Sequence, residues 1–311
     1  MKLKPAERKW FLKKRRAFLT FLGGAVGAWG VNAVLDRTSG RIHKALLPEK
    51  GAPEKLHTRL DLAFDLFLRS KGRTDFSLPE NWTQGPPDVI LPDGRKTYGH
   101  EAAVLQTIVR FLDRHMLITW DARDEPWSAL KNASRVMLAS GSSNLDSAGI
   151  IGTPESPLFS TKLGDRQIDL TYVIGMGTGE LTRLQYNKSV TRNRLAIRNP
   201  ADAIVVQATG ENGIQVDDYL LVTRVPGPSP HTVVTVLSGL HGPGTRAAEL
   251  LFNNTVSGQD LDELASAIHH EPGQPAYFQA VFRASHFVEV DGSSVPTEIE
   301  LVTEGCPPVR L

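Results

Sequence analysis

Two glycine-rich segments hold the residues best suited to bind a ligand. One, residues 140–144, follows the apolar run 135–139, and the other, residues 238–245, follows the apolar run 232–237. Glycine and small hydroxyl side chains leave backbone N–H groups open to phosphate or carboxylate oxygens. The sequence therefore predicts a site for a small anionic ligand, nucleotide-like or carboxylate-bearing. Its predicted binding residues are Gly141, Ser142, Asn144, Gly239, His241, Gly242, Gly244 and Thr245.

The second segment carries two further features. Thr245 is the expected N-cap of a helix over 246–252, and His241 adds a group that titrates near neutral pH. Neither segment continues into Gly-Lys-Ser/Thr, and neither has the Gly-x-Gly-x-x-Gly order of a dinucleotide fold, so no cofactor is predicted. Tight strand-to-helix turns explain both segments equally well, and this structural interpretation stays open.

An exported hydrolase or transferase is the alternative function. Ser142 or Ser143 would be the nucleophile and His241 its base, if the fold brought them together. Asp217 or Asp218 would be the carboxylate that orients the histidine. No Gly-x-Ser-x-Gly elbow is present, so the catalytic assignment stays open. A third alternative is an interaction or structural protein without a small-molecule site.

No metal site is predicted from the sequence. His269 and His270 are adjacent, so on a helix they point in different directions, unlike a metal-binding pair four residues apart. The chain has one cysteine, Cys306, which excludes a cysteine-cluster site and an intramolecular disulfide.

The body also resembles a group of bacterial α/β proteins of unassigned function. In that group a strand ends in Gly-Ser-x-x-Asn, a later segment reads Asp-Tyr before apolar residues, and a glycine-rich loop ends in Gly-Thr before an alanine-rich helix. This chain matches at 141–144, at 218–222 and at 239–248. The resemblance spans roughly residues 135–303; it implies that this region is one domain, and it implies no activity.

The formal net charge of +1 conceals an asymmetry along the chain. Residues 1–16 hold eight basic side chains and one acidic side chain, which leaves 27 basic and 33 acidic side chains in the rest. Residues 17–35 then form a run of 19 uncharged residues. As a helix, this run matches a hydrocarbon core of about 30 Å. Because the more basic flank stays cytoplasmic, we expect the body to face outward.

The start of the apolar run resembles the twin-arginine export signal of bacteria. Residues 15–19 read Arg-Arg-Ala-Phe-Leu, the order found in that signal, although Lys14 and Thr20 depart from its usual flanks. The run is interpreted as a cleavable signal or an uncleaved transmembrane anchor; the eight basic residues before it disfavour the third interpretation, a helix buried in a soluble core. The signal and the anchor both place the body outside the cytoplasm, at the bacterial inner membrane or exported after cleavage, and an uncleaved run makes the membrane a partner through 17–35.

Composition and pattern divide the remaining chain into a polar tether over 36–55, a helical layer over 56–130 and an α/β domain over 131–311. The body has an acidic net charge and no basic stripe, so nucleic-acid binding is not predicted.

Hydrophobic spacing predicts the elements of this body. Apolar residues three and four apart predict helices over 56–68, 102–112, 246–252 and 261–270. Short apolar runs predict strands over 116–120, 135–139, 167–174, 219–225, 232–237, 277–290 and 297–302. Hairpin turns at 226–230 and 291–292, together with strand-to-helix turns, predict an α/β fold with a mixed sheet and flanking helices.

Overall fold

The structure is a computed structural model that describes part of the chain. It describes residues 61–70, 73–77, 89–90, 96–97, 99–114, 133–138, 144–185, 187–230, 232–253, 256, 258–290 and 292–311. The predictions for the basic tip, the apolar run 17–35, the tether 36–55 and the strand 116–120 lie outside these residues. Among the helices in the described ranges, none is long and apolar enough to cross a membrane.

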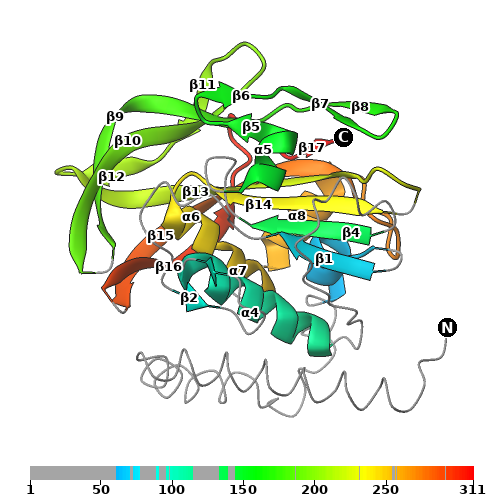
Figure 1. The fold of residues 1–311 in the computed structure, drawn as a ribbon, viewed down its shortest axis with the longest axis horizontal. Coiled ribbons are helices and arrows are strands. Elements are labelled where there is room, and N and C mark those ends of the chain that lie inside the picture. Colours follow the sequence, from blue (N-terminus) through cyan, green and yellow to red (C-terminus); the bar gives the residue numbers. More distant parts are fainter. Residues whose placement is uncertain are drawn as a thin grey trace.

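Strands make up most of the regular structure (Figure 1). The helices are residues 61–67, α4 (Gly99–Arg114), α5 (Leu145–Ile151), α6 (Gly242–Arg246), α7 (Ala248–Phe252) and α8 (Gly258–Ala267). The early strands are β1 (Arg73–Ser77), β2 (Val89–Ile90), β3 (Lys96–Thr97), β4 (Ala133–Leu138), β5 (Gly152–Thr153), β6 (Ser156–Pro157), β7 (Ser160–Leu163) and β8 (Arg166–Asp169). The later strands are β9 (Val173–Gln185), β10 (Lys188–Arg198), β11 (Ile204–Gln207), β12 (Thr209–Glu211), β13 (Ile214–Pro226), β14 (Val233–Gly239), β15 (Phe278–Val290), β16 (Ser293–Leu301) and β17 (Val309–Arg310).

One large mixed sheet organises these elements. β1, β4 and β14 are parallel neighbours, in that order. β13 then pairs antiparallel with β14 on one side and with β15 on the other, and β16 pairs antiparallel with β15. The parallel strands thus lie on one side of β13 and an antiparallel hairpin on the other.

β13 has different partners along its length. Residues 220–224 pair with β14 on one side and with β15 on the other, whereas residues 214, 215 and 217 pair with β12 and Ile214 also pairs with β9. β9 forms a long antiparallel hairpin with β10, and β11 continues that part of the sheet. Asp218 is therefore at the point where β13 passes from one set of partners to the other.

Hydrophobic clusters cover both faces of the parallel strands. Val136 and Leu138 of β4 point into a cluster with residues 61–68, α4, α7 and α8. Met137, between them, points into a second cluster with Ile150 and Ile151 of α5. This alternation follows from the two-residue period of a strand. It also explains the continuous apolar run of β4, which is buried on both faces.

The helix over 61–67 is fixed to the sheet by two kinds of contact. The ring of Phe67 makes edge contacts with Phe252, Phe278 and Phe282, with centroids 6.0–6.2 Å apart. The guanidinium of Arg224 from β13, which is completely buried, donates to the backbone carbonyls of Asp65, Leu66 and Arg69. The last carbonyls of a helix have no partner within it, and Arg224 supplies partners for them.

The predicted mixed sheet with flanking helices is confirmed, but the described chain is richer in strand than an α/β pattern suggests. β4, β13, β14, β15 and β16 match five of the predicted strands, and both predicted hairpins join antiparallel partners. The β9–β10 hairpin was not predicted. Much of β10 is exposed and polar, so it lacks the apolar alternation that marks a half-buried strand.

Two boundaries differ from those predicted. The single strand over 167–174 is divided into β8 and β9, because Oε1 of Gln279 accepts hydrogen bonds from the backbone N–H groups of Thr171 and Tyr172 at the break. The segment 56–130, predicted to be a helical layer, contributes β1 to the main sheet. Its short polar sequence, Arg-Thr-Asp-Phe-Ser, carries no strand pattern, and parallel pairing with β4 determines its conformation.

Candidate functional site

The two glycine-rich segments begin at neighbouring strand ends. β4 and β14 are adjacent and parallel, and Leu138 at the end of β4 pairs with Leu237 near the end of β14. The helices that follow lie on opposite faces: α5 packs into the cluster of Met137, and α7 packs into the cluster of Leu138 (Figure 1). In open α/β sheets, ligands bind where adjacent parallel strands send their connections to opposite faces.

The first segment is described only at its last residue. Gly141, Ser142 and Ser143 lie outside the described residues. Asn144 is the N-cap of α5, and its Oδ1 accepts from the N–H groups of Asp146 and Ser147.

The amide nitrogen of Asn144 is also bound within the protein. Nδ2 donates to the carbonyls of Leu138 at 2.8 Å and Ser77 at 3.2 Å, so this side chain links the ends of β1 and β4. The contacts of Asn144 are structural, and its side chain is buried within the protein.

The second segment is folded closely upon itself. A Cβ atom on Gly239 would lie 1.9 Å from the nitrogen of Thr245, and one on Gly244 would lie 2.6 Å from the carbonyl oxygen of Tyr219. These two glycines therefore allow the loop to approach its own backbone and β13. Gly242 differs, because a Cβ there would meet the ring of His100, 2.8 Å from Cδ2.

The predicted capping role of Thr245 is wrong. The first helix after the loop, α6, begins at Gly242, with His241 at the N-cap position and no side-chain capping bond. Pro243 at the start of this helix explains the earlier beginning, because its fixed φ suits the first turn. The hydroxyl of Thr245 instead accepts a hydrogen bond from the N–H of Gly239 and closes the loop.

Asp218 is completely buried beneath this loop. Its Oδ2 accepts a 2.8 Å hydrogen bond from the N–H of Gly244, and its Oδ1 accepts from the N–H of Tyr219 at 2.9 Å. Desolvation raises the pKa of Asp218 to about 6, although the backbone bonds and the charge of Arg183 favour the ionised form. Asp218 therefore titrates near neutral pH within the fold.

Sequence reasoning missed three residues of this site, His100, Arg183 and Gln215. His100 comes from the first turn of α4 and packs on Gly242. Arg183 of β9 lies within electrostatic reach of His100, His241 and Asp218. Desolvation lowers the pKa of His100 and of His241 to about 3, with nearby arginine charges adding to the effect.

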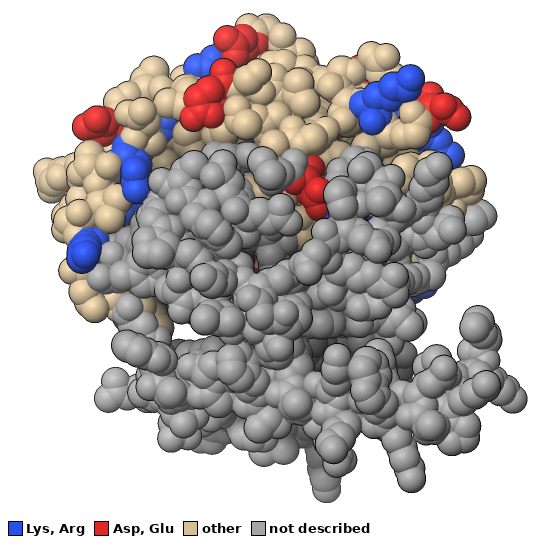
Figure 2. All heavy atoms as spheres, viewed as in Figure 1, with Lys and Arg blue, Asp and Glu red and all other residues tan. Residues whose placement is uncertain are grey.

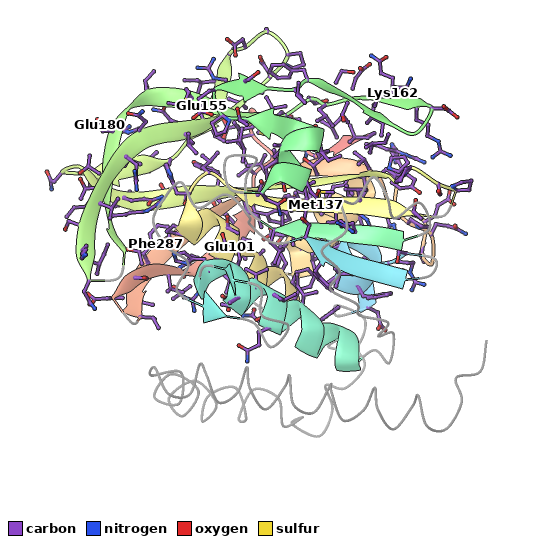
Figure 3. The ribbon with its side chains drawn as sticks, in the orientation of Figure 1. Glu101, Met137, Glu155, Lys162, Glu180 and Phe287 are labelled. Atoms are coloured by element: carbon purple, nitrogen blue, oxygen red, sulfur yellow. The ribbon has the colours of Figure 1, made fainter. Side chains whose placement is uncertain are left out.

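Figure 3 labels two residues that lie next to residues of this site. Glu101, which follows His100 at the start of α4, and Met137, which precedes Leu138 at the end of β4, both lie in the middle of the view.

The arrangement gives limited support to the hydrolase alternative. The hydrogen bonds of Asp218 in the described structure go to Tyr219 and Gly244, and its side chain also interacts with Gln215. None of these contacts orients His241. Because Ser142 and Ser143 lie outside the described residues, their distance from His241 stays a prediction. Over the described ranges, no group of three or more metal-binding side chains is assembled.

Comparisons with protein-family models, with curated proteins and with solved structures found no match.

Proposed function

We propose that the body is a binding domain for a small anionic ligand, nucleotide-like or carboxylate-bearing, at the carboxyl ends of β4 and β14. The observation that carries the proposal is the divergence of α5 and α7 to opposite faces after adjacent parallel strands. This is the position at which open α/β sheets form a crevice. The proposal is supported by the pairing of Leu138 with Leu237, which brings together the strand ends from which the two glycine-rich segments continue.

In this proposal a charged side chain attracts the anion, and the backbone N–H groups at the starts of α5 and α6 do not. The N–H groups of Asp146 and Ser147 bond to Asn144, and the N–H of Gly244 bonds to Asp218. Arg183 supplies positive charge beside the second loop. Among the described residues visible in Figure 2, basic and acidic side chains are interspersed.

Calorimetric titration of the full chain with a panel of nucleotides and small carboxylates tests this proposal. We expect one panel member to bind, and we expect the Gly242→Val, His241→Ala double variant to lose that binding, because a side chain at 242 collides with the ring of His100. His286→Ala is the matched control, since the side chain of His286 is 70% exposed on β15. Unchanged binding in the double variant would place the ligand elsewhere.

We also propose that the body is tethered to the bacterial inner membrane or exported. The support is the sequence of residues 1–35, with eight basic side chains before a 19-residue uncharged run. A tag at the C-terminus, followed through cell fractionation and protease treatment of spheroplasts, tests the proposal. A tag that stays with the membrane and is digested by protease indicates an anchor. A shortened product in the soluble exported fraction indicates cleavage of a signal. A tag found in the soluble cytosol contradicts both interpretations.

A further inference from the structure

The β9–β10 hairpin is basic, although the body as a whole has an acidic net charge. Residues 181–198 hold five basic side chains and no acidic one. The Nε atoms of Arg194 and Arg198 donate to backbone carbonyls of β9, so these two side chains are held against the hairpin itself. The other three basic residues are Arg183, Lys188 and Arg192.

The pairing of β9 with β10 places these three cations on one face of the hairpin. Val190 pairs with Arg183, and Lys188 and Arg192 are each two residues from Val190 along β10. Side chains two residues apart in a strand point to the same side, and the residue directly opposite shares that side. Arg183 is therefore a diagonal neighbour of both other cations, at a distance of about 7–8 Å. Because residues 181–198 include no acid, no carboxylate of the hairpin shares this face.

Contacts at the tip and across the strands hold the hairpin in place. The N–H of Asn187, in the turn between β9 and β10, donates a 2.8 Å hydrogen bond to the carbonyl of Gly292, in the turn between β15 and β16 (Figure 1). The hydroxyls of Thr182 and Thr191 are 2.8 Å apart across the two strands. The cations are thus presented by a fixed framework, which lowers the entropic cost of binding a ligand.

Arg183 connects this face with the second loop. Arg183 is only 6% exposed, and its charge acts on His241 in the loop and on Asp218 beneath it. The ionised carboxylate of Asp218 offsets part of the charge of Arg183 in return. Lys188 and Arg192 are exposed, and within the described ranges neither forms an ion pair with a carboxylate. Three cations against one carboxylate leave about two positive charges beside the loop for a ligand to neutralise.

We propose that the ligand carries an oligophosphate group, two or more linked phosphates, and that Lys188 and Arg192 bind this group on the hairpin face beside Arg183. A single carboxylate has one charge and leaves the other cation unpaired, whereas linked phosphates carry charge along their length. The guanidinium binds phosphate through two N–H groups and the ammonium binds it as a point charge. The inference rests on the proposed function and narrows its ligand from a small anion to an oligophosphate.

Calorimetric titration of the full chain with phosphate, pyrophosphate, tripolyphosphate and citrate tests the charge and the chemistry of the ligand. We expect tripolyphosphate to bind about tenfold more tightly than phosphate, because it can reach both exposed cations. Equal binding of the two overturns the inference. Citrate presents several negative charges on carboxylates, so citrate binding as tight as that of pyrophosphate would contradict the assignment to phosphate.

Titration with ATP distinguishes two sources of the same group. Tighter binding of ATP than of tripolyphosphate assigns the oligophosphate to a nucleotide, and the reverse order assigns it to a free oligophosphate. Either order supports the inference if both bind more tightly than phosphate.

A double variant of the hairpin face separates direct contacts from net charge. Lys188→Gln with Arg192→Gln should weaken tripolyphosphate binding about tenfold and change phosphate binding little. The matched control, Lys162→Gln with Arg166→Gln, removes one lysine and one arginine that are exposed on β7 and β8. Figure 3 labels Lys162 and Glu180 of β9 at opposite sides of the view. Equal losses in the two double variants would mean that net charge alone attracts the ligand, which overturns the inference.

Circular dichroism checks that both double variants are folded, as expected for substitutions at exposed side chains. The single variant Arg192→Gln carries the test if the double variant of the hairpin is not folded, with an expected loss of about threefold.

The outcomes distinguish this inference from the proposed function. Binding of an anion that is lost in the Gly242→Val, His241→Ala double variant, but is unchanged in Lys188→Gln with Arg192→Gln, overturns the inference and leaves the proposed function standing. Tripolyphosphate binding that only the hairpin variant weakens confines the site to the hairpin face and contradicts the proposed function at the ends of β4 and β14.

Discussion

The N–H of Gly244 donates a 2.8 Å hydrogen bond to Oδ2 of Asp218, so β13 places a carboxylate at the start of α6. The second oxygen of this carboxylate is bound by the N–H of Tyr219. The position that a bound anion would take at this loop is therefore filled by the protein itself. A ligand anion reaches the N–H of Gly244 only by displacing Asp218, which is why the proposed site depends on Arg183.

Replacement of Asp218 with Asn should change how stability depends on pH. Burial raises the pKa of this carboxyl from 3.8 to about 6, so the folded state binds more protons than the unfolded state between these values. Stability contributed by the protonated acid is therefore lost as pH rises through that interval, at a cost of about 3 kcal/mol at neutral pH. Relative to wild type, the free energy of unfolding of Asp218→Asn should increase by about this amount as the pH is raised from 4 to 7, as measured by urea unfolding. Glu300→Gln, at an exposed carboxylate on β16, is the control. A difference between Asp218→Asn and wild type that does not vary with pH would contradict the burial of the charge.

Replacement of His100 with Gln should have the opposite effect on the pH dependence. Desolvation lowers the pKa of His100 from 6.5 to about 3, so the unfolded state binds more protons between these values. The stability contributed by neutral His100 is fully present above pH 6.5 and is lost on acidification, at up to about 1.4 kcal/mol per pH unit. His100→Gln should flatten the acid limb of the stability profile measured by urea unfolding. The exposed residue His286, replaced with Gln, should leave the limb unchanged. Parallel acid limbs for His100→Gln and wild type would show that His100 is solvated.

Arg224→Met should destabilise the fold by about 3 kcal/mol or more, because it leaves helix carbonyls without a donor. The wild-type guanidinium is buried, with a pKa lowered to about 9 by desolvation, and its donors bind the carbonyls of Asp65, Leu66 and Arg69. Urea unfolding measures the loss, and hydrogen exchange should show faster exchange in 61–70 than elsewhere. Arg283→Met is the control, since Arg283 is 42% exposed on β15. Equal exchange in wild type and Arg224→Met over 61–70 would mean that other contacts hold this helix.

Asn144→Ala should cost about 2–3 kcal/mol, through loss of the α5 cap and of two buried hydrogen bonds. Asn144→Asp keeps the capping oxygen but loses the donor to Leu138 and Ser77, so it should also destabilise the protein. Asn199→Ala is a matched control, because Asn199 also accepts from two backbone N–H groups but in an exposed turn. Thermal unfolding compares the three variants. A loss for Asn144→Ala as small as that for Asn199→Ala would show that the link between β1 and β4 contributes little.

The sequence predicted those strands of the sheet whose burial requires an apolar pattern. β4 and β14 are buried on both faces and read as continuous apolar runs, whereas β10 is largely exposed and β1 is held by its partner strand. The close-packed second loop could be predicted because its glycines cluster after an apolar strand.

The polar residues that come to the second loop from other elements could not be predicted in the same way. His100 and Arg183 come from α4 and β9, and only the fold brings them to the second loop. Asp218 did carry a signal, since it shares a strand face with buried Leu220 and Val222, where a charged residue is unusual.

The order of strands in the sheet has a consequence for how the chain folds. Ser134 and Val233, 99 residues apart, are joined by a hydrogen bond at the start of β4 and β14, whereas β13 and β14 are separated only by a tight turn. Pairing between distant segments must overcome a larger loss of chain entropy, so it forms later than local pairing. The β13–β14 hairpin is therefore expected to form first, with β4 and β1 adding to its edge, so the pairing of β4 with β14 that positions the proposed site is among the last features of the sheet to be completed.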